Sequence, residues 1–474
     1  MYPAQTSLIP VTVAIARFWE TNGFGAFGSI YPFWYLGVAF RYLSGPVIPL
    51  LITGLKSILP NVSLFSITIY LVFFSFGLAV VGWGILATKI SGNRSIGLLV
   101  SGLTLILPWR YFASLALDEA SFSIARNFLP YVLTAFWVFV RQKTKIRAAL
   151  TVVATSFLLL LNTSLLPILL VGISGTILAA SFREGKIRNL TNHIKVSFSV
   201  LAAAVMLVTF WYTPSYWITI LTNPSIGGAS GFKVILRILD LLKAAIPFFL
   251  AVLAVYFSGR VKTRFTLFGL TWIFTFFFLT IFRFIGDPDF WTDWTSWFWE
   301  LEVGIAFLAA RPLVELFTRP KLAHILLFLG LSSSFLFSFF VYRKLGRPEL
   351  ISSQIPAGVA SLEKLAEIAG ERRVFLSGST VFWANALYDI HQVRGGRDQV
   401  ATNPDWDKAA YELREGKDTG LAEGWLNKLD ISYVLVHSGA SKEYYHDFRH
   451  IEKWDRLGDI VWQESGDAIL KVSP

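Results

Sequence analysis

The sequence predicts an α-helical polytopic membrane domain followed by a C-terminal α/β domain on the outer side of the membrane. Of the 474 residues, 54% are hydrophobic and only 15% are charged, which is far from the composition of an ordinary soluble domain. Several apolar runs are long enough to cross a bilayer core of about 30 Å. The composition changes near Pro356, and the last ~120 residues have the size and makeup of a soluble domain.

Residues 63–344 form the predicted multipass domain, with about ten candidate spans of about 18 or more mainly apolar residues each. The connection between the spans at 148–164 and 165–182 is the shortest. The ten candidates are 64–88, 96–116, 121–140, 148–164, 165–182, 196–213, 236–257, 265–283, 301–317 and 321–341.

Basic residues occur in every second loop between these spans. Short loops rich in Lys and Arg stay on the cytoplasmic side, so the loops near Lys89, Arg141–Arg147, Arg183–Lys195, Arg260–Arg264 and Arg319 are predicted to be cytoplasmic. The alternate segments, including everything after residue 342, then face outward. We therefore expect a plasma-membrane protein with its C-terminal domain outside the cytoplasm.

The net charge of +11 reflects this topology. From Pro356 onward, 14 Lys and Arg stand against 19 Asp and Glu, so the positive excess lies in the membrane domain. No soluble basic stripe or nucleic-acid-binding motif accompanies it, and we expect no nucleic-acid partner. The absence of cysteine excludes disulfides, thiol catalysis and cysteine metal sites.

Residues 1–62 are predicted to be a first outward loop with interfacial helices. Residues 8–19 fit a short amphipathic helix along the membrane surface, and an aromatic-rich run at 31–59 is broken by Gly45, Pro46 and Pro49. Neither stretch fits a signal peptide or a span. If this loop lies outside, a helix must carry it there, so we expect a first transmembrane helix upstream of Met1.

Residues 356–474 are predicted to be a small sheet with helices packed on it. The segments SLEKLAEIAG and AEGWLNKLD have helical patterns. Short apolar or alternating segments bounded by turn residues indicate strands. These segments are RVFLSG, SYVLVH, DIVWQE and AILKV.

Two clusters of ionisable residues lie at the predicted outward ends of spans, where such residues indicate function. In one cluster, Asp118 and Glu119 form a tight turn, with Arg110 before it and Arg126 after it. The other cluster lies in GDPDFWTDWTSWFWE, residues 286–300. It combines Arg283 with Asp287, Asp289 and Asp293 and with the tryptophans Trp291, Trp294, Trp297 and Trp299.

Paired carboxylates can hold a divalent cation, accept a proton or stabilise an oxocarbenium-like transition state. Arginine suits a phosphate, and tryptophan can stack on a sugar or an isoprene chain. The alternative is structural: polar loops leave membranes, tryptophan anchors at the interface, and Arg110 and Arg126 snorkel or pair with the acids.

Two features of the C-terminal domain are weaker indications. His446 and His450 have the spacing of a metal site on one helical turn, but without a third ligand a surface helix is favoured. The stretch VRGGRDQ places two glycines between Arg394 and Arg397, which suits either an anion-binding loop that contacts a lipid or glycan, or a structural turn.

Two segments carry a family resemblance. The tail RVFLSGSTVFWANALYDIHQVRGGRDQVATNPDW with ISYVLVHSGASKEYYHDF resembles the outward domain of prokaryotic membrane proteins named 6-pyruvoyl-tetrahydropterin synthase-related. The N-terminal ARFWETNGFGAFGSIYPFWYLG resembles their first outward loop. The residues support no pterin chemistry. The whole architecture is similar to type C glycosyltransferases.

The type C resemblance implies transfer of a sugar from a polyprenyl-phosphate donor to a lipid, glycan or protein acceptor, with a divalent cation such as Mg²⁺ or Mn²⁺. In that class the first outward loop carries an Asp, whereas this sequence has none before Asp118. This departure either reflects a chain that continues upstream of Met1 or marks a member without that acid.

The resulting hypothesis assigns a role to each candidate residue. The loop 284–300 would cover a groove for the donor lipid, and the alternative is a non-catalytic membrane protein that binds a polyprenyl-linked glycan or docks a cell-envelope partner. The assignments are catalysis for Asp118, Glu119, Asp287 and Asp289; metal binding for Asp118 and Asp287; donor-phosphate binding for Arg283, Arg110 and Arg126; and glycan or lipid contact for Trp291, Trp294, Arg394 and Arg397.

Overall fold

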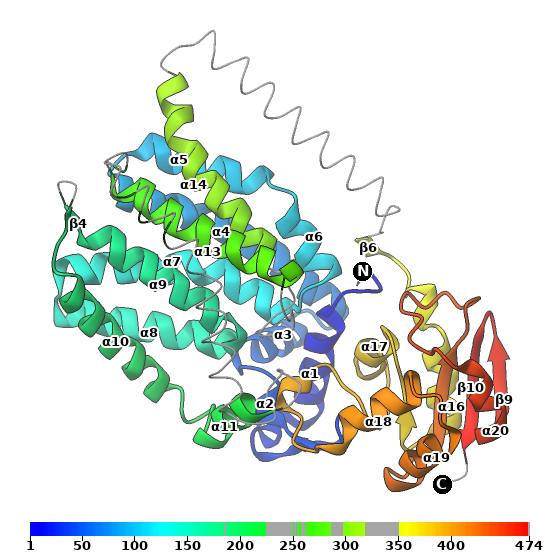
Figure 1. The fold of residues 1–474 in the computed structure, drawn as a ribbon. Helices are drawn as coiled ribbons and strands as arrows, with labels where there is room; N and C mark the ends of the chain where they lie inside the picture. Colours follow the sequence, from blue (N-terminus) through cyan, green and yellow to red (C-terminus); the bar gives the residue numbers. More distant parts are fainter. Residues whose placement is uncertain are drawn as a thin grey trace.

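The computed structural model consists of a bundle of long helices, an N-terminal segment beside one end of the bundle, and a C-terminal unit packed on that segment (Figure 1). The structure describes residues 1–183, 186–223, 263–285, 297–317 and 350–472, together with the single positions 250, 253, 256 and 261.

The bundle is built from helices that begin at polar caps and continue through apolar sequence. Ser63, Asn93 and Thr144 accept a backbone N–H in the first turns of α4, α5 and α8, as preferred N-cap residues do. The helices are α4 (Leu64–Ser91), α5 (Arg94–Ile106), α6 (Trp109–Ala116), α7 (Ala120–Gln142), α8 (Lys145–Leu161), α9 (Leu166–Ser181), α10 (Leu190–Leu207), α11 (Pro214–Thr222), α13 (Arg264–Ile285) and α14 (Trp297–Phe317).

Small and hydroxyl side chains let the helices approach closely. A Cβ on Gly97 of α5 would lie 1.9 Å from Thr88 Oγ1 and 2.7 Å from Gly84 O of α4, so only glycine fits there. Ser101 Oγ donates to Val80 O at 2.9 Å across the same contact. Such small-residue contacts are typical of helices that pack within a membrane.

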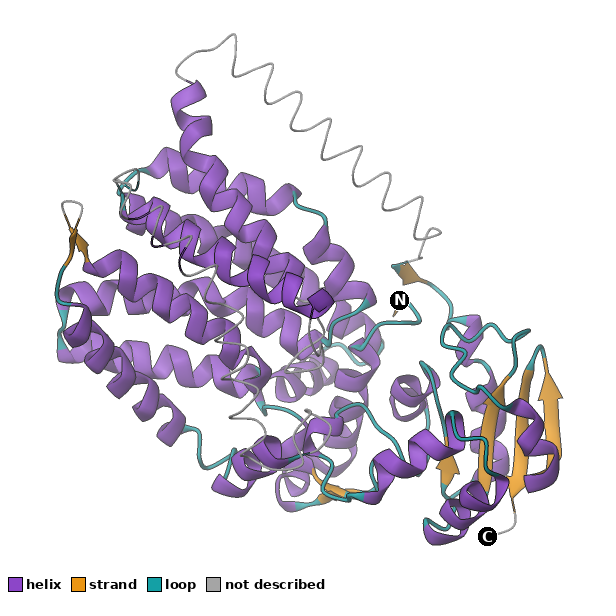
Figure 2. Cartoon of the chain, viewed as in Figure 1, coloured by secondary structure: helices purple, strands orange, loops and turns teal. Residues whose placement is uncertain are grey.

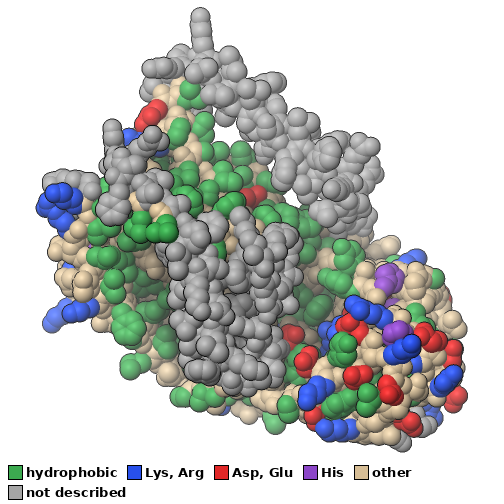
Figure 3. Space-filling view, in the orientation of Figure 1, with side chains coloured by type: hydrophobic (Ala, Val, Ile, Leu, Met, Phe, Trp, Pro, Cys, Tyr) green, Lys and Arg blue, Asp and Glu red, His purple; other side chains and the backbone are tan. Residues whose placement is uncertain are grey.

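Four described helices are long and apolar enough to cross a membrane, and a fifth span is obtained if the bent pair α5 and α6 is counted as one. The four lie at Leu64–Ser91, Ala120–Gln142, Thr163–Ser181 and Leu190–Leu207. Figure 3 shows hydrophobic side chains over the visible face of the bundle, whereas charges of both signs cover the C-terminal unit. Two of the ten predicted spans, 236–257 and 321–341, lie almost wholly outside the described residues.

Several helix ends next to predicted basic loops lie together at one end of the bundle. Ser91, Asn93, Arg264 and Arg311 line one cavity of about 460 Å³, and Arg264 Nε donates to Phe182 O at 2.8 Å. A short hairpin of β4 (Phe182–Arg183) and β5 (Lys186–Ile187) follows α9 at this end. The predicted cytoplasmic loops near Lys89, Arg183 and Arg264 thus lie at one end of the bundle, and the sidedness of that end stays a prediction.

The N-terminal segment contains helix α1 (Ile9–Asn22), but this helix does not lie on a surface as the sequence analysis expected. Residues 9–16 are all buried, and so is Trp19. The stretch IPVTVAIA has no continuous polar face, and a helix that is apolar all round is normally buried. The rest of the segment comprises β1 (Tyr2–Pro3), η1 (Gly23–Gly28), β2 (Ile30–Tyr31), β3 (Val38–Ala39), α2 (Phe40–Leu43) and α3 (Val47–Ile58).

The C-terminal unit is a four-stranded sheet in the order β7-β8-β10-β9, with helices packed on it (Figure 2). Strand β7 (Val374–Phe375) runs parallel to β8 (Tyr433–His437), and the other neighbours are antiparallel. The other two strands are β9 (Gly458–Glu464) and β10 (Asp467–Val472), and the helices are α16 (Ser361–Ala369), α17 (Thr380–Leu387), α18 (Asp405–Arg414), α19 (Thr419–Lys428) and α20 (Trp454–Leu457).

The N-terminal segment joins the bundle to the C-terminal unit. Strand β1 pairs with β6 (Ile351–Ser352), and Trp34 Nε1 donates to Asn385 Oδ1 of α17 at 2.8 Å. A Cβ on Gly395 would lie 2.5 Å from Trp34 Cγ. The loop around Gly395 therefore lies directly against this tryptophan.

Candidate functional site

Asp118 lies in the turn between α6 and α7, at the end of the bundle next to the N-terminal segment. Its Oδ2 is 3.0 Å from Nη1 of Arg126, which lies two helical turns further along. Nε of the same guanidinium is 3.1 Å from Oε1 of Glu300, in the first turn of α14. All three side chains are buried. Arg126 is thus a cation shared by two carboxylates from different helices.

Aromatic rings enclose this ion pair network. The Arg126 guanidinium carbon is 4.5 Å from the ring centres of both Phe122 and Trp299, a distance at which a cation is attracted to a π face. Trp299 belongs to the tryptophan-rich stretch singled out in the sequence, and it is 2% exposed. Here a buried indole stabilises a buried arginine.

Arg110 lies nearby but is bound to the backbone. Its Nη1 donates to Thr104 O and its Nη2 to Phe76 O, both at 2.9 Å. Thr104 O lacks its usual helical partner because Pro108, four residues later, has no N–H. This geometry favours a structural role for Arg110 over the predicted contact with a donor phosphate.

Glu119 forms a second network, which connects the bundle to the C-terminal unit. Its Oε2 accepts bonds from Arg397 Nε at 3.0 Å and Nη2 at 2.5 Å. Its Oε1 accepts the Ser121 hydroxyl at 2.5 Å, and Asn162 Nδ2 donates to that hydroxyl at 2.9 Å. Burial disfavours the charged guanidinium, but Glu119 together with Tyr216 and Tyr212 more than offsets this, so the pKa of Arg397 is raised. These two hydrogen bonds to one carboxylate oxygen are a fixed connection between the two parts of the molecule.

Arg394 and Arg397 bind different partners. Arg394 Nη1 donates to Ser377 Oγ at 3.1 Å, within the C-terminal unit. Burial, with the neighbouring Arg414, lowers the pKa of Arg394. A Cβ on Gly396 would lie 2.6 Å from Val11 Cγ2 of α1. The glycines of VRGGRDQ therefore serve a close backbone approach, which favours the structural turn over an anion-binding loop.

The predicted cluster around the tryptophan-rich loop is only partly described. Arg283 belongs to the last turn of α13, but its side chain lies outside the described residues, and so do Asp287, Asp289, Trp291 and Trp294. The predicted metal pair of Asp118 and Asp287 is therefore not described as a pair. Within the described ranges, no group of three His, Asp or Glu could hold a metal ion.

The segment with His446 and His450 is not the predicted surface helix. Residues 442–450 contain no helix. His446 Nδ1 lies 3.2 Å from Ser438 O, and His450 Nδ1 lies 3.2 Å from Glu452 Oε1. Because the two rings have separate partners, the helical spacing does not correspond to a shared site.

Sequence reasoning missed two acids on α14. Glu300 joins Arg126, and Glu302 Oε1 accepts the backbone N–H of Trp109 at 3.0 Å. Both residues stand at the beginning of a strongly apolar helix, where an acid is costly unless it is paired. The criterion that identified Asp118, an ionisable residue at the outward end of a predicted span, would have identified Glu300 and Glu302 too. The partner of Glu119 is 278 residues away in the sequence, and no local pattern indicated it.

Searches of protein-family models and of curated proteins find no match to this chain. Solved structures do match. The Archaeoglobus fulgidus oligosaccharyltransferase, determined with a tethered acceptor peptide containing the NVT sequon, superposes with a TM-score of 0.58 at 12% identity, over 92% of this chain and 65% of that one. A mutant form of the arabinofuranosyltransferase AftD from mycobacteria gives 0.52 at 16% identity, over 100% of this chain and 40% of that one.

This chain shares the fold of these two solved enzymes. The same archaeal enzyme, in complex with an inhibitory peptide and a dolichol-phosphate, superposes at 0.51 and 12% identity over 90% of this chain and 65% of that one. The chain thus spans under two thirds of the archaeal enzyme and less than half of AftD. At these identities the likeness establishes the fold alone.

Proposed function

We propose that this protein is a membrane glycosyltransferase that moves a sugar from a polyprenyl-phosphate donor to a lipid, glycan or protein acceptor on the outer face of the membrane. The observation that carries the proposal is the fold, which is shared along almost the whole chain with two enzymes of that class. The archaeal relative was determined with a dolichol-phosphate and with an acceptor peptide, which are molecules of the donor-lipid and acceptor classes proposed here.

The network around Arg126 has the groups that such a reaction uses. In the transfer, the acceptor loses a proton, its oxygen or nitrogen bonds to C1 of the sugar, and the C1–O bond breaks with its electron pair leaving on the polyprenyl phosphate. Asp118 is suited to accept the proton and Arg126 to bind the phosphate. Donor binding then requires Arg126 to exchange one carboxylate partner for phosphate oxygens.

Glu119 is better suited to positioning than to catalysis. Both of its oxygens accept short hydrogen bonds, from Arg397 and from Ser121, so neither is poised to take a proton. Its two hydrogen bonds from Arg397 hold the loop at Arg397 against the turn that carries Asp118. We therefore assign the base to Asp118 and the alignment of the C-terminal unit to Glu119.

A divalent cation stays a prediction. The described acids offer no set of three ligands, and Asp118 is engaged by Arg126.

Asp118→Asn tests the assignment, because it removes the charge and keeps the shape. Loss of a general base typically lowers a rate by about 100-fold or more. We expect that loss in transfer of labelled sugar from lipid-linked sugars of native membranes to purified protein with acceptor. Glu315→Gln, an exposed acid at the opposite end of the bundle, is the control and should retain full activity. Full transfer by Asp118→Asn would overturn the assignment.

A second function is favoured by one observation: Asp118 and Glu119 are both buried against arginines. Such pairs suit a non-catalytic protein that holds a polyprenyl-linked glycan. Binding of lipid-linked sugar without any turnover, in protein that is monodisperse and correctly inserted, would select this alternative over the transferase.

A further inference from the structure

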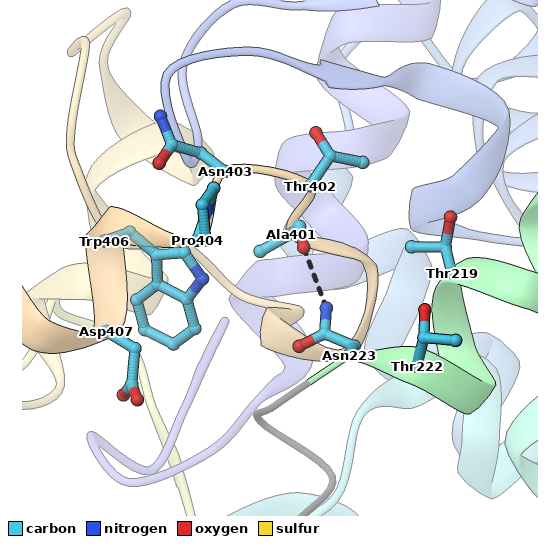
Figure 4. Close-up of a pocket in the computed structure, with 9 residues that line it drawn as sticks. All are labelled: Thr219, Thr222, Asn223, Ala401, Thr402, Asn403, Pro404, Trp406 and Asp407. Atoms are coloured by element: carbon cyan, nitrogen blue, oxygen red, sulfur yellow. Dashed lines mark hydrogen bonds between the residues drawn. The ribbon is translucent and has the colours of Figure 1, made fainter. Parts of the chain in front are cut away.

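A cavity of about 240 Å³ lies between helix α11 of the bundle and the loop 401–407 of the C-terminal unit (Figure 4). Asn223, directly after α11, connects its two walls. The Asn223 Nδ2 group lies within hydrogen-bonding distance of the carbonyl oxygens of Asp398 and Gln399, both at 3.0 Å, and of Ala401 at 2.8 Å. The Asn223 side chain therefore holds helix α11 against the backbone of residues 398–401.

One wall is an immobilised indole. Trp406 is only 6% exposed, and Tyr35 packs edge-on against it with ring centres 5.1 Å apart. Its Nε1 donates no hydrogen bond to any part of the chain that the structure describes. Figure 4 shows Trp406 and Asp407 on one side of the cavity, opposite Thr219 and Thr222. The indole thus offers the cavity an aromatic surface and an N–H.

The remaining polar groups supply both acceptors and donors. Asp407 is exposed and has no hydrogen bond or ion pair with described residues. Thr219 and Thr222 donate their hydroxyl protons to backbone carbonyls of α11 at 2.8 Å, which leaves oxygen lone pairs as acceptors. Asn403 Oδ1 accepts the Asp405 N–H at 2.8 Å, which leaves its amide N–H groups as donors.

These groups fit a neutral sugar. Sugar hydroxyls donate and accept hydrogen bonds, and the C–H face of a pyranose or furanose packs on an aromatic ring. Among the described residues that line the cavity there is no Lys or Arg, so these residues offer none of the bidentate donors that recognise phosphate. Its volume is below the roughly 300 Å³ at which pockets for drug-sized ligands begin, which limits the occupant to about one ring.

The geometry points to a subsite that binds one ring of a neutral saccharide between Trp406, Asp407 and Thr222. It is built on the same loop as Arg397, the partner of Glu119. As a subsite for donor or acceptor glycan it rests on the proposed transferase function. Binding of the free sugar does not require turnover.

The test uses the full chain in nanodiscs without any donor lipid. Saturation-transfer NMR is recorded with mannose, glucose, galactose, N-acetylglucosamine and arabinose, and with glucuronic acid and mannose 1-phosphate as anionic comparisons. We expect at least one neutral sugar to bind, and Asp407→Asn and Thr222→Val each to weaken it about tenfold, equivalent to about 1.4 kcal/mol. Asp455→Asn, an exposed acid of α20, is the control and should bind as the native protein does.

Three results would overturn the subsite: no neutral sugar binds, only the anionic sugars bind, or the Asp407 and Thr222 variants bind as tightly as the control. The assay separates this inference from the proposed function. Sugar binding that depends on Asp407 in a protein that never turns over a donor would retain the subsite and reject the transferase. Sugar transfer by a protein that binds no free sugar in this cavity would reject the subsite and retain the transferase.

Discussion

Asp118 and Glu119 are adjacent in the chain but have different surroundings. Asp118 shares Arg126 with Glu300 inside the bundle, whereas Glu119 reaches out of the bundle to Arg397 of the C-terminal unit. The two adjacent residues therefore have different roles: Asp118 is suited to catalysis, and Glu119 is suited to aligning the C-terminal unit. The sequence predicted that this acid pair matters, but it did not divide the roles, because the division depends on Arg397.

The Glu119–Arg397 pair should be strongly coupled. Removing one partner of a buried pair leaves an uncompensated charge that typically costs about 3–5 kcal/mol, whereas replacing both partners is much less costly. We expect Arg397→Met to lower the melting temperature of the detergent-solubilised protein by several degrees. Adding Glu119→Gln should recover most of that loss.

The exposed pair Arg17–Asp389, with side chains 30% and 64% exposed, is the matched control. Exposed pairs typically contribute about 0.2–1 kcal/mol, so the same double-mutant cycle on this pair should show little coupling. Equal coupling in the two cycles would contradict the buried connection.

At the scale of elements, apolar runs in the sequence predicted the helices well, but the position of a break within a helix was not predicted. Runs such as 64–88 and 121–140 coincide with α4 and α7, and the four strand segments of the tail coincide with β7 to β10, because length and period are local properties. The predicted span 96–116 is instead two helices bent by 47°. Because the whole segment 96–116 is apolar, the sequence analysis did not predict that Pro108 breaks it into two helices.

The bend depends on how Pro108 and Arg110 compensate each other. Pro108 leaves the Thr104 carbonyl without a helical donor, and the Arg110 side chain supplies one. Arg110→Met should therefore destabilise the protein, since a buried unpaired carbonyl costs about 1–3 kcal/mol.

In a Pro108→Ala background residue 108 regains its N–H, so the same Arg110→Met change should cost clearly less. Melting temperatures of the two single variants and the double variant in detergent measure this. An unchanged cost for Arg110→Met in both backgrounds would show that the backbone hydrogen bond is not what Arg110 provides.

At the scale of the whole molecule, the predicted division into an N-terminal loop, a bundle and a tail domain does not describe how they pack. The segment 1–62 contributes to the core, because residues 9–16 of its helix α1 are buried and its Trp34 lies against the loop at Gly395. Its contacts with the tail join residues more than 350 positions apart, as the Trp34–Asn385 bond does. Periodicity cannot predict contacts of this kind, because each side of the junction looks locally like any other apolar surface.

This junction should be sensitive to a single methyl group. At Gly395 a Cβ would lie 2.5 Å from Trp34 Cγ and 2.8 Å from Tyr35 Cε2, and overpacking of this kind typically costs about 1–3 kcal/mol. Gly424 within α19 is the matched control, since a Cβ there meets nothing within 4 Å and alanine favours a helix by about 0.5–1 kcal/mol. We expect Gly395→Ala to lower the melting temperature and Gly424→Ala to leave it unchanged or raise it. If both variants melted like the native protein, the C-terminal unit would not be held on the N-terminal segment by this contact, and its alignment would depend on other contacts such as Trp34–Asn385 and Glu119–Arg397.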